Sequence, residues 1–212
     1  MVTVVPVGEV IETYAYFYVD DATKHGFLID PGAEADKLLG IIAKRGFTIE
    51  KILLTHGHFD HIGAVQKVRE KLNIPVIMHE NGRKYAENTA WNLSANFGLD
   101  ITLDDVTYLP DGSVITPAAN PAMSLAMQSV PGHTTDGVIY VSADKKIAFV
   151  GDTIFKNSYG NTSFIGGDEK TLMKSIAERI FSLPDDTTLL SGHSDPTTVG
   201  EERLRPWYRD YL

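Results

Sequence analysis

Short apolar runs alternate with amphipathic stretches through the first half of the chain. The apolar runs are rich in valine, isoleucine, tyrosine and phenylalanine, side chains that favour strands. They predict strands at Val2–Val7, Tyr14–Val19, Phe27–Ile29, Ile52–Leu54 and Ile74–Met78. Apolar residues at helical spacing predict helices over residues 34–45 and 62–72, and Gly46 is suited to cap the first of them.

The second half begins with a weak pattern and then becomes β-rich again. Residues 80–112 are rich in asparagine, aspartate and glycine, and within them Tyr85–Leu93 fits a helix; this region could form a substrate wall or a dimer surface. Strands are then expected at Ser113–Thr116, Ser124–Val130, Gly137–Val141, Ile147–Val150 and Thr188–Leu190, with a helix at Thr171–Phe181. Two β-rich halves, each with helices, favour two sheets packed face to face with the helices outside.

Composition adds mainly exclusions. Among 212 residues, 19 are Lys or Arg and 28 are Asp or Glu, which gives a formal net charge of −9. Nucleic acids and anionic membranes select basic surfaces, so the expected partner is a small-molecule substrate, and the oligomeric state stays open. The absence of cysteine excludes a disulfide scaffold, a cysteine nucleophile and a cysteine-type zinc finger. No signal-like start and no membrane-length apolar run is found, so a cytoplasmic location is expected.

The histidines are clustered. Three of the seven lie in the segment Thr55–His61, between a predicted strand and a predicted helix. His56 and His58 are two residues apart and can point the same way, while Asp60 and His61 begin the next turn and can face a neighbouring point. Imidazole and carboxylate groups bind zinc and other first-row metals, so this segment suits two adjacent ions. The alternative is a polar loop with Thr55 or Asp60 as a helix cap. That interpretation does not explain three imidazoles, which are costly to bury without partners.

Three later loops each add one ligand-type residue. His133, Asp152 and His193 each stand beside a glycine, shortly after a predicted strand. Singly, each could be a turn or capping residue. Together with the first segment they make five histidines and two aspartates, enough for two metal ions with a shared carboxylate. His25 and His79 lie outside this pattern and are expected to be structural.

These motifs resemble the metallo-β-lactamase superfamily. Thr55–His61 matches its His-x-His-x-Asp-His motif, and Leu28–Gly32 matches its Ile-Asp-Pro-Gly turn. The resemblance covers about residues 10 to 206 and implies a single domain over residues 1–212, an α/β fold built as a four-layer αββα sandwich. Within the superfamily the chain most resembles the glyoxalase II group (hydroxyacylglutathione hydrolases) in a short form without the C-terminal helical domain. The segments that carry this closer resemblance are Gly151–Phe155, Gly166–Asp168 and Thr197–Arg203.

The resemblance also implies a ligand set and a reaction. His56, His58 and His133 would hold one metal, Asp60, His61 and His193 the other, and Asp152 would bridge them. The ions would be divalent, zinc first, with iron or manganese as alternatives. A metal-bridging hydroxide would attack a thioester such as S-lactoylglutathione, with Asp60 and Asp152 as the catalytic carboxylates. Asp30 is expected to support a ligand histidine from behind.

Other functions remain open at this point. About 19 residues follow His193, so the glutathione-holding C-terminal region is expected to be missing, and Asn161 and Ser163 stand where the family places basic and aromatic or acidic residues. The hydrolytic chemistry is therefore better supported than the glutathione carrier. The alternatives are a persulfide dioxygenase with one iron on the first three histidines, an acyl-homoserine lactonase with the same two metals, and a non-enzymatic binding module.

Overall fold

The first of two six-stranded sheets is built from the N-terminal half of the chain. The computed structural model of the protein describes residues 1–211. The sheet follows chain order: β1 (Val2–Val7), β2 (Thr13–Val19), β3 (His25–Ile29), β4 (Thr48–Leu53), β5 (Val76–His79) and β6 (Val106–Leu109). The first three strands are antiparallel and the last four run parallel. Helices α1 (Ala35–Arg45), α2 (Phe59–Ile62) and α3 (Val65–Leu72) lie in the crossovers, since parallel strands need long connections.

The second sheet comes from the C-terminal half. Its strands lie in the order β14 (Thr197–Thr198), β13 (Thr188–Ser191), β10 (Ile147–Gly151), β9 (Val138–Ser142), β8 (Leu125–Ser129) and β7 (Val114–Ile115). Only β10 and β13 pair in parallel, and α5 (Glu169–Ser175) lies in the connection between them. A small hairpin joins β11 (Ile154–Phe155) to β12 (Ser158–Tyr159), and α6 (Val199–Arg203) follows β14. Short 3-10 turns span Glu80–Gly82, Ser94–Phe97, Pro121–Met123 and Pro206–Tyr211.

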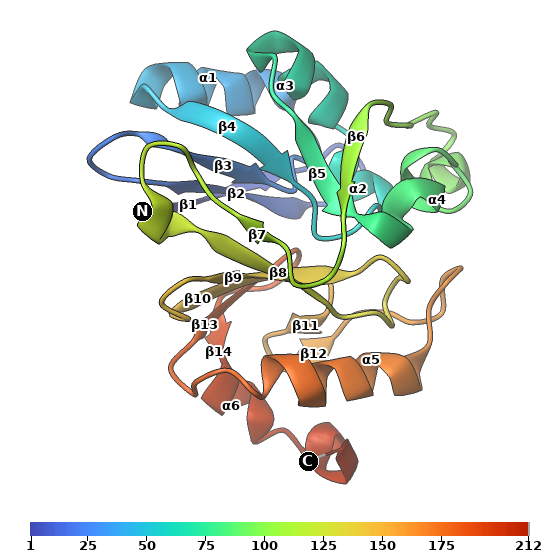
Figure 1. The fold of residues 1–212 in the computed structure, drawn as a ribbon. Helices are drawn as coiled ribbons and strands as arrows, with labels where there is room; N and C mark the ends of the chain where they lie inside the picture. Colours follow the sequence, from blue (N-terminus) through green and yellow to red (C-terminus); the bar gives the residue numbers. More distant parts are fainter. Residues whose placement is uncertain (212) are drawn as a thin grey trace.

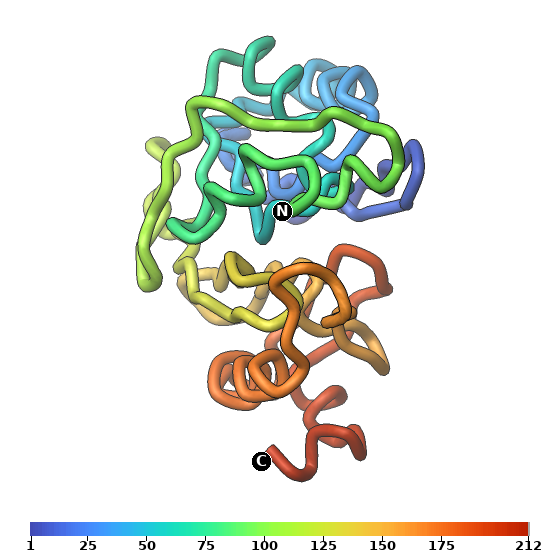
Figure 2. The backbone as a smooth tube through the Cα atoms, turned by 90° about the vertical axis from the view of Figure 1, so that its right-hand side faces the viewer, coloured from blue at the N-terminus to red at the C-terminus, as the bar shows by residue number. Residues whose placement is uncertain are grey.

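The two sheets face each other, with helices on both outer faces. Figure 1 shows α1 and α3 above the first sheet, and α5 and α6 below the second. Alternation along β2 explains this layering: Phe17 packs in the apolar cluster under the helices, while Tyr16 points to the other sheet, 5.4 Å from the ring of Phe149. The two halves of the chain form separate upper and lower parts in Figure 2. The predicted αββα sandwich is confirmed.

Three predicted elements differ from those observed. The helix expected over 62–72 is divided into α2 and α3, because the Ala64 N–H donates to Pro31 O at 3.0 Å instead of continuing one helical ladder. The helix expected at Tyr85–Leu93 is only one turn, α4 (Arg83–Ala86), because Asn88 Oδ1 accepts from the backbone of Ala90 and Trp91 and turns the chain. The helix expected at Thr171–Phe181 begins earlier, capped by Asp168, and widens to a π-helix over Ile176–Ile180.

Strand β6 went unpredicted, since its four residues are isolated among polar ones. None of the helices in residues 1–211 combines the length and apolar character needed to cross a bilayer.

Candidate metal centre

All seven predicted ligand residues meet at one end of the two sheets. They lie in the segments that follow β4, β8, β10 and β13, with Asp60 and His61 on α2, so strands from both sheets deliver them. Their potential ligand atoms fall into three overlapping sets in which every pair lies within 4.8 Å. The sets are His56, His58 and His133; His56, His61 and Asp152; and Asp60, His61 and His193. The fold therefore joins groups that are up to 137 positions apart in the sequence (193 minus 56).

The first set consists of three buried imidazoles that converge on one point. His58 Nδ1 lies 3.2 Å from His56 Nε2 and 3.0 Å from His133 Nε2. The His133 Nδ1–H donates to the carbonyl of Asn161 at 2.6 Å, which leaves the Nε2 lone pair facing inward. Burial, with the neighbouring histidines, lowers the pKa of His58 to about 3 and that of His56 well below its usual value. These rings are neutral, the form in which imidazole binds a metal.

Asp60, His61 and His193, called the second ligand set from here on, pair two histidines with a carboxylate. His193 Nε2 lies 3.1 Å from Asp60 Oδ2, and His61 Nε2 lies 3.6 Å from the same oxygen. Their outer nitrogens are both held: His61 Nδ1 donates to Asp30 at 3.0 Å and His193 Nδ1 to the carbonyl of Glu12 at 2.7 Å. Burial opposes charge on His193, but Asp152 and Asp60 outweigh it and raise its pKa to about 10. Metal ligands must be deprotonated, so a metal ion bound here would displace the proton of His193 Nε2.

Asp152 lies between the two sets. Its Oδ1 is 3.3 Å from His61 Nε2, while its Oδ2 is 3.3 Å from His193 Nε2 and 3.6 Å from His133 Nε2. Burial opposes ionisation, but His61 and His193 hold the pKa of this carboxyl well below its usual value. One carboxylate therefore faces both groups of ligands, the position that a bridging ligand needs.

Unsatisfied buried atoms test whether a cation fits here. His61 Nε2 and Asp152 Oδ1 are buried and have no hydrogen-bond partner among the described residues. Leaving such atoms unpaired costs about 1–3 kcal/mol each. Tetrahedral ligands about 2.0–2.1 Å from a zinc ion lie roughly 3.3–3.4 Å apart. The inward-facing contacts given above range from 3.0 to 3.6 Å, and every pair within each set lies within 4.8 Å, so the donor set, burial and geometry fit divalent metal ions.

Asp30 links His56 of the first ligand set, through Thr55, to His61 of the second. Its Oδ1 accepts from the Thr55 N–H at 2.8 Å, and its Oδ2 accepts from Thr55 Oγ1 at 2.6 Å and from His61 Nδ1 at 3.0 Å. Thr55 Oγ1 lies in turn 3.2 Å from His56 Nδ1. The contact between Asp30 and a ligand-type histidine was expected. The role of Thr55 as the link to His56 was missed, although its place directly before His56 was the available signal.

Replacing Asp30 by asparagine is expected to lower metal affinity by about 10–100-fold, the usual effect of losing a carboxylate behind a ligand histidine. A neutral amide is a weaker acceptor than a carboxylate for the hydrogen bonds from Thr55 and His61. The rings of His61 and, through Thr55, of His56 therefore lose orientation. Competition with a chromophoric chelator measures the affinity. Asp186→Asn, which alters an exposed ion pair with Lys146, is the matched control. An affinity equal to that of the wild type would remove Asp30 from this role.

Gly192 leaves room for the cluster. A Cβ at this position would lie 2.7 Å from His61 Cε1 and closer still to Asp152 Oδ1. We expect Gly192→Ala to displace both side chains and to reduce metal affinity, with hydrolysis lower by about 100-fold, as for other small misplacements of reacting groups. Gly40→Ala in α1, where nothing lies within 4 Å, is expected to leave metal binding unchanged and to add up to about 1 kcal/mol of helix stability. Equal metal binding in both variants would contradict the crowding argument.

The two histidines that were expected to be structural, His25 and His79, lie outside the ligand sets. His25 Nδ1 pairs with Glu50 at 2.8 Å, and His79 Nδ1 accepts from the Asn81 N–H at 3.3 Å; neither belongs to the three ligand sets. Asn161 Oδ1 accepts from the Ser163 N–H at 2.8 Å, so the amide is engaged within its own loop. Thr13, which the sequence did not single out, donates to Asp60 Oδ2 at 2.9 Å.

Comparison with known sequences gives a consistent set of relatives. Residues 9–193 match the family model described as the metallo-beta-lactamase superfamily. A Bacillus subtilis (strain 168) protein named probable metallo-hydrolase YqgX is 37% identical over 202 residues, 93% of this chain and 92% of that protein. The hydroxyacylglutathione hydrolase GloC of Haemophilus influenzae is 31% identical over 186 residues, 86% of each chain.

Solved structures agree with this result. The B3 metallo-beta-lactamase BLEG-1 matches with a TM-score of 0.91 at 34% identity, over 99% of this chain and 100% of that one. TTHA1623, solved in a di-iron-bound form, matches with 0.82 at 32% identity, over 96% and 99%. ETHE1 from Myxococcus xanthus matches with 0.78 at 25% identity, over 96% and 82%.

Proposed function

Since the chain belongs to the metallo-β-lactamase superfamily, as its motifs predicted, we propose that it hydrolyses thioesters at a binuclear metal centre. A probable metallo-hydrolase is among its relatives, and its His/Asp cluster fits a binuclear site. The observation that carries the proposal is Asp152, which faces both ligand sets at once. A site for a single ion needs a carboxylate that faces one group of ligands, whereas Asp152 faces His133 on one side and His61 and His193 on the other.

The proposed ligands follow the two sets. His56, His58 and His133 would hold one ion, and Asp60, His61 and His193 would hold the other. Asp152 would contact both. Divalent cations bound there would supply an activated water and a polarised carbonyl. Zinc suits the nitrogen-rich donor set, and iron is the alternative that the di-iron form of TTHA1623 supports.

The protein's own groups position the reactants. Asp60 Oδ2, already oriented by the hydroxyl of Thr13, accepts a hydrogen bond from the attacking water. The water oxygen bonds to the acyl carbon, the carbon–sulfur bond breaks, and sulfur leaves with the electron pair as a thiolate. The water's protons end on the thiolate and in solution, so the products are a carboxylate and a thiol. A thiolate leaves readily, which explains why a separate acid is not required.

The relationship to GloC supports a thioester substrate, with glutathione as one carrier to be tested. A second candidate is persulfide oxidation at one iron, held by His56, His58 and His133. The similarity to ETHE1 favours it, because that set forms a complete three-histidine site by itself.

Elemental analysis of protein purified without added metal is the deciding experiment. We expect about two ions per chain, together with hydrolysis of S-lactoylglutathione or of a simple thioester. About one iron per chain, no hydrolysis and oxygen uptake on glutathione persulfide would overturn the proposal in favour of the dioxygenase.

A further inference from the structure

A cavity of about 540 Å³ lies beside the metal cluster, on the Asp60 side. Its walls come from the loop between β1 and β2, the start of α1, the α2–α3 segment and residues 99–101. Asp60 belongs both to this wall and to the second ligand set, so the cavity borders the metal-ligand cluster at this residue. The volume falls in the range of about 300–1,000 Å³ typical of small-molecule sites.

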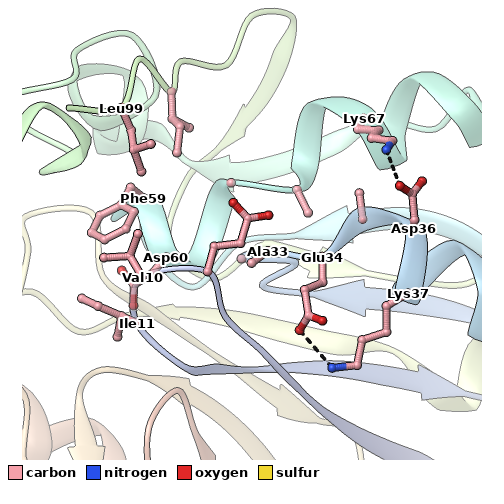
Figure 3. A pocket seen from close by; sticks show the side chains of 16 residues that line it. Val10, Ile11, Ala33, Glu34, Asp36, Lys37, Phe59, Asp60, Lys67 and Leu99 are labelled. Atoms are coloured by element: carbon pink, nitrogen blue, oxygen red, sulfur yellow. Dashed lines mark hydrogen bonds and ion pairs between the residues drawn. The ribbon is translucent and has the colours of Figure 1, made fainter. Parts of the chain in front are cut away.

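One end of the cavity is apolar. Figure 3 shows Val10 of the β1–β2 loop beside Phe59, with Leu99 beyond the Phe59 ring and Ile11 next to Val10, and all four line the cavity. Val10 is 50% exposed and Ile11 39% exposed, so both present apolar surface to solvent. Phe97, also exposed, stacks 4.8 Å from the ring of Phe59 and extends this apolar surface. Clustered exposed apolar residues of this kind mark binding surfaces.

The other end is charged, but it offers no free cation. Lys37 pairs with Glu34 at 2.9 Å and Lys67 with Asp36 at 2.7 Å, as Figure 3 shows. Glu9 lines the same cavity and has no ion-pair partner in residues 1–211. The lining therefore carries an excess of negative charge, which repels an anionic substrate arm.

The loop that contains Asn161 and Phe164 lies beside the first ligand set, and it also presents an apolar side chain. Phe164 is 39% exposed, and its ring centre lies 5.7 Å from that of His58. In the same loop the side chain of Asn161 bonds to Ser163. This side of the cluster offers an aromatic ring, and Lys156, which precedes the loop, pairs with Asp195 at 3.5 Å.

We propose that the cavity binds a neutral, apolar arm of the substrate, so that the preferred thioesters carry an alkyl or aryl chain in place of the doubly carboxylated glutathione. This assignment rests on the proposed thioester hydrolysis and names its substrate class. Apolar contacts with Val10, Ile11, Phe59 and Leu99 hold the arm, and the acidic lining selects against anions.

A chain-length series on metal-loaded protein tests the assignment. Acyl thioesters of N-acetylcysteamine, from acetyl to octanoyl, and acetyl thioesters of alkyl thiols of the same lengths vary each arm in turn. We expect kcat/KM to rise up to about fourfold per methylene in one of the two series, as for a CH₂ group leaving water. S-lactoylglutathione should lie below the longer neutral thioesters.

The matched variants are Val10→Asp in the cavity and Val114→Asp on β7. Val114 is 63% exposed and is not among the cavity residues, so its replacement adds the same charge elsewhere. Val10→Asp should lower the ratio of kcat/KM between the longest and the acetyl substrate by about tenfold, because an apolar chain would meet a charge. Val114→Asp should leave the ratio unchanged.

Calorimetry on metal-free protein gives a readout that is independent of turnover. The neutral thioether S-octyl-N-acetylcysteamine should bind with a negative heat-capacity change, the mark of apolar burial, and more weakly to Val10→Asp than to Val114→Asp. If the acetyl thioester is hydrolysed but both series are flat, or the glutathione thioester is the best substrate, the cavity assignment alone is wrong. If no thioester is hydrolysed by the metal-loaded protein, the proposed function is wrong and the assignment fails with it.

Discussion

Asp152→Asn is expected to lower thioester hydrolysis by about 1,000-fold or more and to reduce the metal content of the purified protein. The carboxylate faces both ligand sets, with Oδ1 3.3 Å from His61 Nε2 in the second set and Oδ2 3.6 Å from His133 Nε2 in the first, so its loss weakens the binding of both ions. Stabilisation of transition-state charge by a metal is worth several kcal/mol, and each ~1.4 kcal/mol is tenfold in rate. Elemental analysis and steady-state kinetics on the same preparation measure the two effects together.

Asp186→Asn controls for the change of charge. Asp186 is exposed, precedes β13 at the end away from the cluster, and pairs only with Lys146 at the surface. Surface ion pairs contribute little, so metal content and rate should match the wild type. Two ions and full activity in Asp152→Asn would show that the carboxylate does not bridge.

His58→Ala is expected to remove about one ion per chain and most of the hydrolytic activity. His58 contributes to the first ligand set alone, where its Nδ1 lies near the Nε2 atoms of His56 and His133. The second set keeps Asp60, His61 and His193, and a binuclear enzyme should therefore retain part of its metal. A one-iron dioxygenase would lose all of its metal, because this set would be its only site.

The matched histidine is His25. It pairs with Glu50 at 2.8 Å and lies outside the three ligand sets, so His25→Ala should cost some stability and no metal. Thermal unfolding, measured beside metal content, separates a misfolded His58→Ala protein from a folded one that lacks an ion. A folded His58→Ala protein with two ions and full activity would remove His58 from the ligand set.

Local pattern sufficed for most of the fold. Phe17 and Tyr16 are adjacent in a run of β-forming residues, and a pleated strand places them on opposite faces whatever surrounds it. The prediction was wrong for elements whose ends are set by hydrogen bonds to residues distant in the sequence. The division between α2 and α3 depends on the carbonyl of Pro31, and β6 exists because it pairs with β5, so neither is visible in the local sequence.

The sequence by itself determined the ligand types, their number and their place after strands, because metal preference belongs to side-chain chemistry and the His-x-His-x-Asp-His spacing is local. Only the tertiary structure decided which atoms face one another. Asp30 reaches Thr55 and His61 across 25 and 31 positions because β3 and β4 lie side by side. The apolar cavity likewise gathers the β1–β2 loop, α1, α2 and residues 99–101, segments with no shared pattern, since only the packing of helices on the first sheet brings them together.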